Sequence, residues 1–178
     1  MQSSWQVWQN QSVADNFTST RRGGMLGGAQ QFETMVALAR QINRSQLTVL
    51  DIGCGDGAVV EVLLKSFNIE RAIALDGSPT MLQKANKRFE GLGLFASIVE
   101  LVEGDFSNPS WLNSLPCREF DIISSGFAIH HCEDNRNKEL YTEIFDLIKP
   151  GGLFVNIEHV ASATPLGEFL FEKAYSAS

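Results

Sequence analysis

Cysteine is scarce in this chain of 178 residues, and the few that occur form no recognisable pattern. Cys54, Cys117 and Cys132 have neither the even number of a disulfide framework nor the paired spacing of a zinc site. Structural disulfides belong to oxidising compartments, whereas free thiols are usual in the cytosol. We therefore expect a reducing, cytoplasmic location and no metal.

Positive charge is also sparse, with 14 basic residues against 21 acidic ones and a formal net charge of −7. Arg21-Arg22 and Lys87-Arg88 are the only adjacent basic pairs, so the sequence lacks the basic stripe that nucleic-acid binding needs. No apolar run reaches the roughly 20 residues of a membrane-spanning helix. The polar, Gln-rich start of the chain is unlike a signal peptide. We expect neither a nucleic acid nor a membrane as a partner.

The sequence does contain an apolar stretch, residues 47–52, followed by Gly53, Gly55 and Gly57 at alternate positions. The stretch predicts a buried parallel strand, and the pattern over residues 58–67 predicts a helix. Glycines let the backbone turn tightly and approach a ligand, because no Cβ atom stands in the way. Strand, glycine turn and helix are typical of the nucleotide-binding corner of a doubly wound α/β fold. A tight turn without a ligand is the alternative.

Strand and helix patterns alternate along the rest of the chain. We expect further strands at residues 71–75, 98–102, 120–124 and 153–157. We expect helices at residues 79–90, 108–115, 135–148 and 165–175, with a break at residues 149–152. Such alternation predicts one parallel sheet with right-handed crossovers.

Residues 1–46 form a helical preface to the domain that we expect at residues 47–178. Its first helix is amphipathic and aromatic, and its second would span residues 29–42. The polar, Gly-rich loop between them, residues 18–28, is a candidate lid over a bound ligand.

Each predicted strand ends on or beside a polar residue. The carboxyl ends of parallel strands lie at one edge of a sheet, and ligands bind there where the strand order reverses. Any one of these residues could be a helix cap or a turn former, but their recurrence after all five strands predicts a binding site. They are Asp51, Asp76, Asp105, Ser125 and Glu158 with His159.

The glycine turn departs from the dinucleotide pattern G-x-G-x-x-G, because Gly57 comes one residue early. Asp56 would face a diphosphate, and like charges repel. Asp76 can still accept hydrogen bonds from both hydroxyls of a ribose. These features favour an adenosine-like ligand with a cationic part and no phosphates, a description that S-adenosylmethionine fits. An NAD-dependent oxidoreductase remains an alternative.

Five segments stand in the order and at the intervals of one known family. They are VLDIGCGDG (49–57), ALDGSPTML (74–82), EGDF (103–106), FDII (120–123) and LIKPGGLF (147–154). On these segments the chain resembles the class I S-adenosylmethionine-dependent methyltransferases, over residues 47–158. The resemblance implies a Rossmann-like, doubly wound α/β fold, which we expect to have the strand order 3-2-1-4-5.

The resemblance also implies how the cofactor is held. Asp51 and the backbone of Gly53, Cys54 and Gly55 would hold the methionine end of S-adenosylmethionine. Asp76 would bind the two ribose hydroxyls, since one carboxylate accepts several hydrogen bonds. The product of the reaction would be S-adenosylhomocysteine.

For the adenine and the amino group, the resemblance implies a second set of contacts. Gly77 and Met81 would lie near the sugar and the adenine. Asp105 would accept a hydrogen bond from the adenine amino group, and the N–H of Phe106 would donate to a ring nitrogen. Ser125 would present its backbone to the amino group of the methionine part.

Methyl transfer from a sulfonium depends mainly on alignment, and a base is needed only when the acceptor is a hydroxyl or a carbon acid. His130 and His131 follow the fourth predicted strand and are candidate catalytic bases. The alternative is that they only line the pocket. Residues 130–134 do not predict a metal site, because adjacent residues do not easily converge on one ion. We expect a small-molecule methyl acceptor; a binding protein without catalysis is the alternative.

The sheet of the family has two further strands after the fifth, and this sequence ends at Ser178, before they would occur. The fifth strand, residues 153–157, is apolar apart from Asn156 and would be an exposed edge. The last helix also carries apolar residues beyond what a solvated tail needs. We therefore expect a homodimer that forms through this edge or through the last helix.

Overall fold

The computed structural model describes residues 28–158 and 160–176. The predicted first helix, all but the last residue of the lid loop and His159 lie outside the described residues. The expected division between residues 1–46 and 47–178 stays a prediction.

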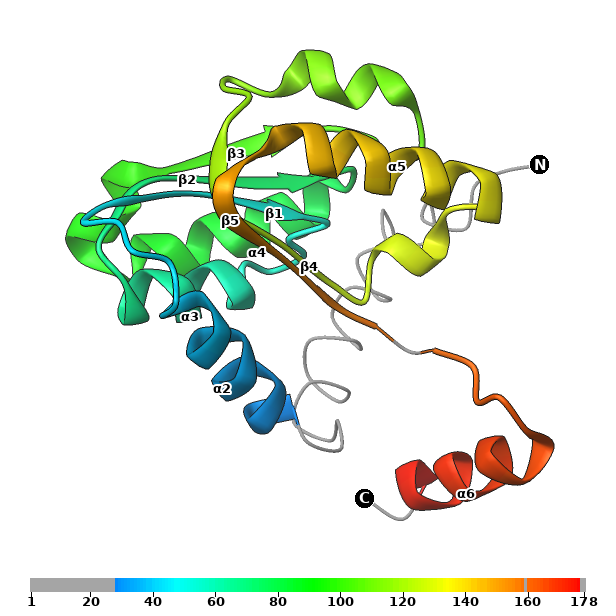
Figure 1. The fold of residues 1–178 in the computed structure, drawn as a ribbon. Coiled ribbons are helices and arrows are strands. Elements are labelled where there is room, and N and C mark those ends of the chain that lie inside the picture. Colours follow the sequence, from blue (N-terminus) through cyan, green and yellow to red (C-terminus); the bar gives the residue numbers. More distant parts are fainter. Residues whose placement is uncertain (1–27, 159, 177–178) are drawn as a thin grey trace.

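Five parallel strands form one sheet in the order β3-β2-β1-β4-β5 (Figure 1). The predicted α/β fold and its strand order are therefore confirmed. The strands are β1 (Leu47–Ile52), β2 (Ile69–Asp76), β3 (Val99–Glu103), β4 (Phe120–Gly126) and β5 (Ile148–Ile157). The order reverses between β1 and β4, the place where such sheets bind ligands.

Helices cover both faces of the sheet (Figure 1). On one face lie α2 (Gly28–Ala39), α3 (Ala58–Ser66) and α4 (Pro79–Glu90), whose apolar sides share one core cluster. On the other face lie the 3-10 helix η4 (Pro109–Ser114) and α5 (Asp134–Leu147), which share a second cluster. Two further 3-10 helices are η3 (Gly93–Ile98) and η5 (Ile129–His131).

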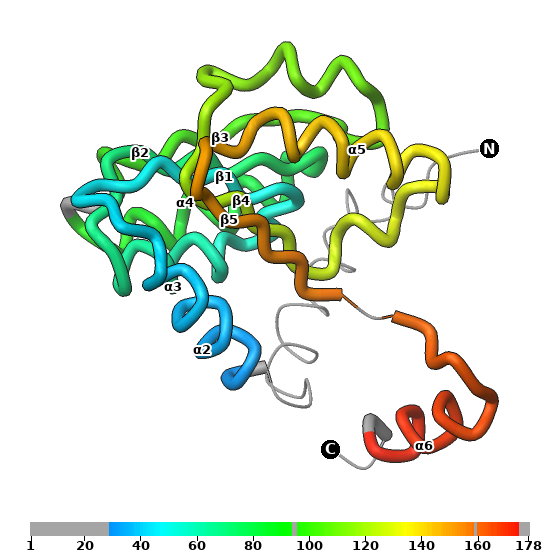
Figure 2. Tube along the Cα trace, in the orientation of Figure 1, coloured from blue at the N-terminus to red at the C-terminus, as the bar shows by residue number. Residues whose placement is uncertain are grey.

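The last helix, α6 (Pro165–Ser176), stands apart from the sheet in Figures 1 and 2. Its large apolar residues are exposed: Leu166, Phe169, Leu170 and Phe171. None of the described helices has both the length and the apolar character that crossing a bilayer requires.

Local sequence signals account for several element boundaries. Ser78 caps α4, where its hydroxyl accepts a hydrogen bond from the N–H of Met81 at 3.3 Å, and proline occupies the first turn. Asn108 caps η4 in the same way, through the N–H of Ser110 at 2.9 Å. These two caps lie in the connections that follow β2 and β3, and they fix where each chain segment leaves the sheet.

The helix α5 ends at Leu147, before the predicted break at residues 149–152, but the fifth strand begins earlier than predicted, because β5 starts at Ile148 and runs through these residues. Phe120 pairs with Ile148, and the next pair is Ile122 with Leu153. Four residues of β5 therefore bulge between two ladder positions. Gly151, at φ +77°, supplies the left-handed conformation that the bulge needs.

The glycine turn after β1 is left-handed at all three glycines, with φ of +69°, +55° and +81° at Gly53, Gly55 and Gly57. At Gly57 an added Cβ would lie 2.4 Å from Cζ of Phe89, a buried residue of α4. The glycine thus lets α4 pack directly against the start of α3.

Gly57→Ala should lower the free energy of unfolding by roughly 2–5 kcal/mol, because a left-handed alanine is strained and its Cβ overlaps the Phe89 ring. Gly151→Ala is the matched control: its φ is +77°, but its Cβ would meet nothing within 4 Å. The control should lose only about 1–2 kcal/mol from backbone strain. Equal losses in urea unfolding would mean that the Phe89 contact adds nothing.

Candidate functional site

Of the polar residues predicted to gather at one edge of the sheet, Asp51, Asp76 and Ser125 lie in the last two positions of their strands, and Asp105 and Glu158 follow theirs. In the ladders, Asp51 lies beside Ser124, Ile52 beside Ser125, and Asp76 beside Glu103. The turns that leave these strands therefore surround the point at which the strand order reverses.

Asp76 joins two of these turns through its carboxylate. Oδ2 accepts a hydrogen bond from the N–H of Gly55 at 2.8 Å, and Oδ1 accepts one from the N–H of Ser78 at 2.8 Å. Burial raises the pKa of Asp76, and the two backbone N–H groups oppose that rise. Each carboxylate oxygen has a further lone pair, so the group can accept hydroxyl hydrogen bonds as well. Gly77 lies between Asp76 and the cap of α4.

The glycine turn is held against β2 and against the connection after β4. The N–H of Cys54 donates to the carbonyl of Leu75 at 2.9 Å, which continues the β1–β2 ladder into the turn. A Cβ at Gly53 would lie 2.3 Å from Cβ of Ala128, so only glycine allows this approach. The Cys54 side chain is buried.

Asp51 and the serines of β4 connect the two central strands. Ser124 Oγ donates to Asp51 Oδ1 at 2.7 Å, and Ser125 Oγ donates to the carbonyl of Ile52 at 2.9 Å. All three side chains are buried. The two serine hydroxyls therefore fix the relative position of β1 and β4 at the centre of the edge.

Asp56 does not have the role that the sequence suggested. Its Oδ2 lies 2.6 Å from Nη2 of Arg88 in α4, and the Nε of Arg88 donates to the carbonyl of Asp56 at 2.7 Å. Arg88 also pairs with Glu61. Because an arginine compensates the Asp56 charge, repulsion of a diphosphate by this residue is not an argument against a dinucleotide.

The connection after β3 is ordered by side-chain hydrogen bonds. Asp105 Oδ1 accepts hydrogen bonds from the N–H and the hydroxyl of Ser107, at 2.9 and 2.6 Å. Phe106 is 8% exposed, and its Cε1 lies 3.4 Å from where a Cβ of Gly53 would be. Met81, 3% exposed, is buried in α4. The Phe106 ring thus lies beside the glycine turn.

Arg136 is a residue of this region that the sequence analysis missed. Its Nε donates to the carbonyl of Phe106 at 3.0 Å, and its Nη2 pairs with Glu143 at 2.6 Å. Trp111 Nε1 donates to the same carboxylate at 2.6 Å. Burial raises the pKa of Glu143, but the hydrogen bonds from Arg136 and Trp111 outweigh it and leave this pKa below its usual value. An acid seven residues after an arginine on one helix was the only sequence signal.

The two candidate catalytic histidines differ in their surroundings. His130 Nδ1 lies 2.5 Å from Oε2 of Glu158, and its backbone N–H donates to Oε1 at 3.2 Å. The hydrogen bond to Glu158 raises the pKa of His130. The ring of His131 lies 4.2 Å from that of His130, centroid to centroid. Burial, with a contribution from His130, lowers the pKa of His131 to about 4.

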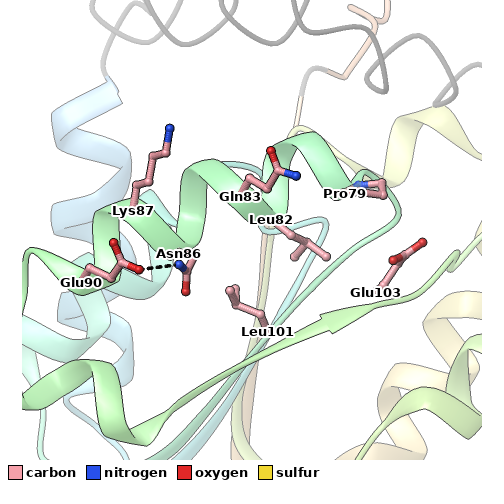
Figure 3. Close-up of a pocket in the computed structure, with 8 residues that line it drawn as sticks. All are labelled: Pro79, Leu82, Gln83, Asn86, Lys87, Glu90, Leu101 and Glu103. Carbon is pink, nitrogen blue, oxygen red and sulfur yellow. Dashed lines mark hydrogen bonds between the residues drawn. The ribbon is translucent and has the colours of Figure 1, made fainter.

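Two cavities border this edge of the sheet. The first, about 510 Å³, runs between α4 and β3, where Leu82 and Leu101 face each other (Figure 3). None of the predicted cofactor-binding residues lines it. The second, about 550 Å³, lies between α2 and the end of β5, and Glu158 is among its lining residues. In the part of the chain that the structure describes, no group of three His, Cys, Asp or Glu side chains could hold a metal ion.

Comparison with known proteins agrees with these features. A family model for a methyltransferase domain matches residues 49–152, more than half of the chain. Carboxy-S-adenosyl-L-methionine synthase of Pectobacterium atrosepticum is 24% identical over 165 residues, 91% of this chain and 64% of that protein. Demethylmenaquinone methyltransferase of Leptospira interrogans is 30% identical over 124 residues, 68% of this chain and 47% of that protein.

A crystal structure of an S-adenosylmethionine-dependent methyltransferase from Clostridium acetobutylicum has the same fold. The TM-score is 0.64 at 22% identity, and the match covers 82% of this chain and 55% of that one. The chain thus spans less than two thirds of the length of each of these three proteins.

Arg136→Gln should lower the free energy of unfolding by about 3 kcal/mol at neutral pH, because it leaves the Glu143 carboxylate without its ion pair. The folded-state pKa of Glu143 lies below its reference value of 4.5, so this stabilisation is present above pH 4.5 and is lost as the pH falls through the folded pKa. The difference in the free energy of unfolding between Arg136→Gln and wild type should therefore shrink in acid.

Glu139→Gln, at an exposed carboxylate 3.5 Å from Arg136, is the control and should change stability by less than about 1 kcal/mol. Equal losses for the two variants in urea unfolding would contradict the role of the Glu143 pair.

Proposed function

Because the chain belongs to the class I S-adenosylmethionine-dependent methyltransferase family, we propose that it binds S-adenosylmethionine and transfers its methyl group to a small-molecule acceptor. The observation that carries the cofactor part is the carboxylate of Asp76. It lies at the end of β2, holds the glycine turn through Gly55, and has lone pairs left for the hydroxyls of a ribose.

The remaining residues fit the same cofactor. Asp51 with the backbone of Gly53, Cys54 and Gly55 would hold the methionine end, at a turn whose glycines keep Cβ atoms away from a ligand. Ser125 would offer its backbone to the amino group from the next strand, since its ladder partner is Ile52 at the end of β1. S-adenosylmethionine supplies a methyl group on a positively charged sulfur.

The adenine would lie between the connections after β2 and β3. Gly77 and Met81 belong to the first connection and to the helix that follows it, and Asp105 and Phe106 belong to the second. Asp105 Oδ1 already accepts two hydrogen bonds from Ser107, so its other oxygen is the better acceptor for the adenine amino group. Arg136 would keep Phe106 in place through the hydrogen bond to its carbonyl.

A small molecule is the acceptor class that the relatives favour. The similar protein of Leptospira interrogans is named for demethylmenaquinone, and the negative net charge of this chain disfavours nucleic acid. A cytoplasmic location also stays a proposal, and the free thiols of Cys54, Cys117 and Cys132 support it.

The cofactor assignment is tested by calorimetry with S-adenosylmethionine and S-adenosylhomocysteine. Asp76→Ala should weaken binding by about 2–4 kcal/mol, because charge-assisted hydrogen bonds are lost and the glycine turn loses its acceptor. Glu100→Gln, an exposed acid on the neighbouring strand β3, is the matched control and should bind as wild type does. An unchanged affinity in Asp76→Ala would refute the assignment.

The same samples separate the alternative functions. A thermal-shift series with S-adenosylmethionine, S-adenosylhomocysteine and NAD should show stabilisation by the first two alone, because a ligand that binds the native state raises its stability. Stabilisation by NAD would instead support the alternative that the protein is an NAD-dependent oxidoreductase. Cofactor binding without product, over a panel of acceptors, would favour the binding protein.

The homodimer is supported by two features of the described residues. The outermost strand on one side of the sheet is β5, and the apolar residues of α6 are exposed. Both present surfaces that favour pairing with another chain. Light scattering after size exclusion at micromolar concentration should give twice the 19.6 kDa of one chain, and a monomer would contradict the dimer.

A further inference from the structure

We propose that His130 and Glu158 form a proton-accepting pair for an acceptor with an ionisable hydroxyl, with His130 as the base and Glu158 as its positioning residue. The inference rests on the proposed function, which it deepens by naming the acceptor class. The sequence predicts that Glu158 lies at the carboxyl edge of the sheet. The distance of Glu158 from His130 along the chain gives no sign that the two side chains are paired.

The geometry of the pair is specific. Glu158 directly follows β5, whereas His130 lies in η5 after β4, 28 residues earlier. One carboxylate oxygen lies 2.5 Å from the ring Nδ1 of His130, and the other accepts a hydrogen bond from the backbone N–H of the same residue at 3.2 Å. A side chain held at two points of one residue cannot easily rotate, so Glu158 fixes the direction of the imidazole ring.

Within the pair, His130 is the more exposed side chain. The Glu158 side chain is 10% exposed and that of His130 is 41% exposed. A carboxylate at Nδ1 places the proton of a neutral imidazole on that nitrogen, so the lone pair is on Nε2. The carboxylate also stabilises the imidazolium that forms when Nε2 takes a proton, and it raises the pKa of His130.

His131 is not suited to the same task. It is half-buried and its pKa is lowered to about 4, so it takes up a proton poorly near neutral pH. Among the described residues, the titratable side chain that acts on the pKa of His130 is Glu158, which follows β5, and the ring of His131 from η5 lies against the His130 ring. Glu158 therefore favours the charged form of His130.

The pair is connected to the cofactor site through the chain segment that precedes it. Ala128 packs against the glycine turn at Gly53. Phe127 has φ +54°, a strained conformation for a residue with a side chain, and its N–H donates to the carbonyl of Ile157 at 2.8 Å. Two successive contacts, Phe127 to Ile157 and His130 to Glu158, thus bind the β4 connection to the end of β5.

Glu158, though not His130, lines a cavity that is the candidate binding place of the molecule that brings the hydroxyl. Its volume of about 550 Å³ is in the range of small-molecule sites. Its walls mix the apolar residues Met35, Leu38 and Val155 with the amides of Gln30 and Gln31. A compact, mostly apolar molecule fits such walls. A base of histidine strength removes a proton far more easily from a phenol or enol than from an alcohol, so the acceptor is of the phenol class.

The step is balanced without any further reactant. The acceptor O–H bond breaks and its proton moves to Nε2 of His130. The oxygen electron pair forms a bond to the methyl carbon, the carbon–sulfur bond breaks, and its electron pair stays on sulfur as S-adenosylhomocysteine. The imidazolium, held by Glu158, then returns the proton to solvent.

The test begins with an observable that does not depend on activity. In the full chain with S-adenosylhomocysteine bound, NMR titration of the histidine ring protons gives the pKa of His130, assigned by the signal missing in His130→Gln. In Glu158→Gln this pKa should fall, because the carboxylate charge is gone. Glu133→Gln, an exposed acid in the same connection that makes no side-chain cap, should leave it unchanged. An unchanged pKa in Glu158→Gln would overturn the pair.

Activity is measured with 2-naphthol and with 2-naphthalenethiol, whose thiol ionises far more readily and has little need of a base. His130→Gln should lose about 100-fold in kcat with the naphthol and less than about threefold with the thiol. Glu158→Gln should lose at least about tenfold with the naphthol, with partial rescue in Glu158→Asp. Equal losses of kcat with both acceptors would mean that the pair only supports the structure. If the wild type does not methylate 2-naphthol, the proposal of a phenol as acceptor is wrong.

Calorimetry on the same variants keeps the two proposals apart. His130→Gln and Glu158→Gln should bind S-adenosylhomocysteine within about twofold of wild type, because neither residue is assigned to the cofactor. If the wild type itself binds no S-adenosylhomocysteine, the proposed function fails whatever the titration of His130 shows.

Discussion

The carboxylate of Asp76 is the contact on which the site depends. It accepts a hydrogen bond from each of two turns, one after β1 and one after β2, and so fixes how these turns face each other. The Gly55 N–H reaches it only because the turn is left-handed at that glycine. Burial works against the charge of Asp76, whereas the two N–H groups favour it. The same balance would favour further donors, such as the hydroxyls of a ribose.

Two partly buried ion pairs support this centre from the helices around it. Arg88 of α4 holds the turn at Asp56, and Arg136 of α5 holds the connection after β3 at Phe106. Each arginine combines an ion pair with a hydrogen bond to a backbone carbonyl, which its fork of N–H donors makes possible. The helices therefore act as more than a cover for the sheet, because they fix loops that local sequence alone leaves free.

What could be predicted from the sequence was local. The strand and helix patterns, the cap at Ser78 and the glycine turn are each encoded within a few neighbouring residues, and the structure has those that fall within its described residues. The partner of Asp56 could not be predicted, since Arg88 lies 32 residues away and only the packing of α4 brings it near. The early start of β5 was missed, because Pro150 and Gly151 indicate a break between helix and strand, whereas they lie in a bulge of the strand itself. Pairings between elements thus needed the structure.

The end of β5 shows how the fold assembles chemistry from distant segments. A parallel sheet sends every connection out at the same edge, so β4 and β5 deliver His130 and Glu158 to one place although 28 residues separate them. The β4 connection must bend sharply to keep this contact, and Phe127 carries the strain of that bend. Strain of this kind persists only where the surroundings fix the backbone on both sides. Here they do so, through Ala128 against Gly53 on one side and Ile157 on the other.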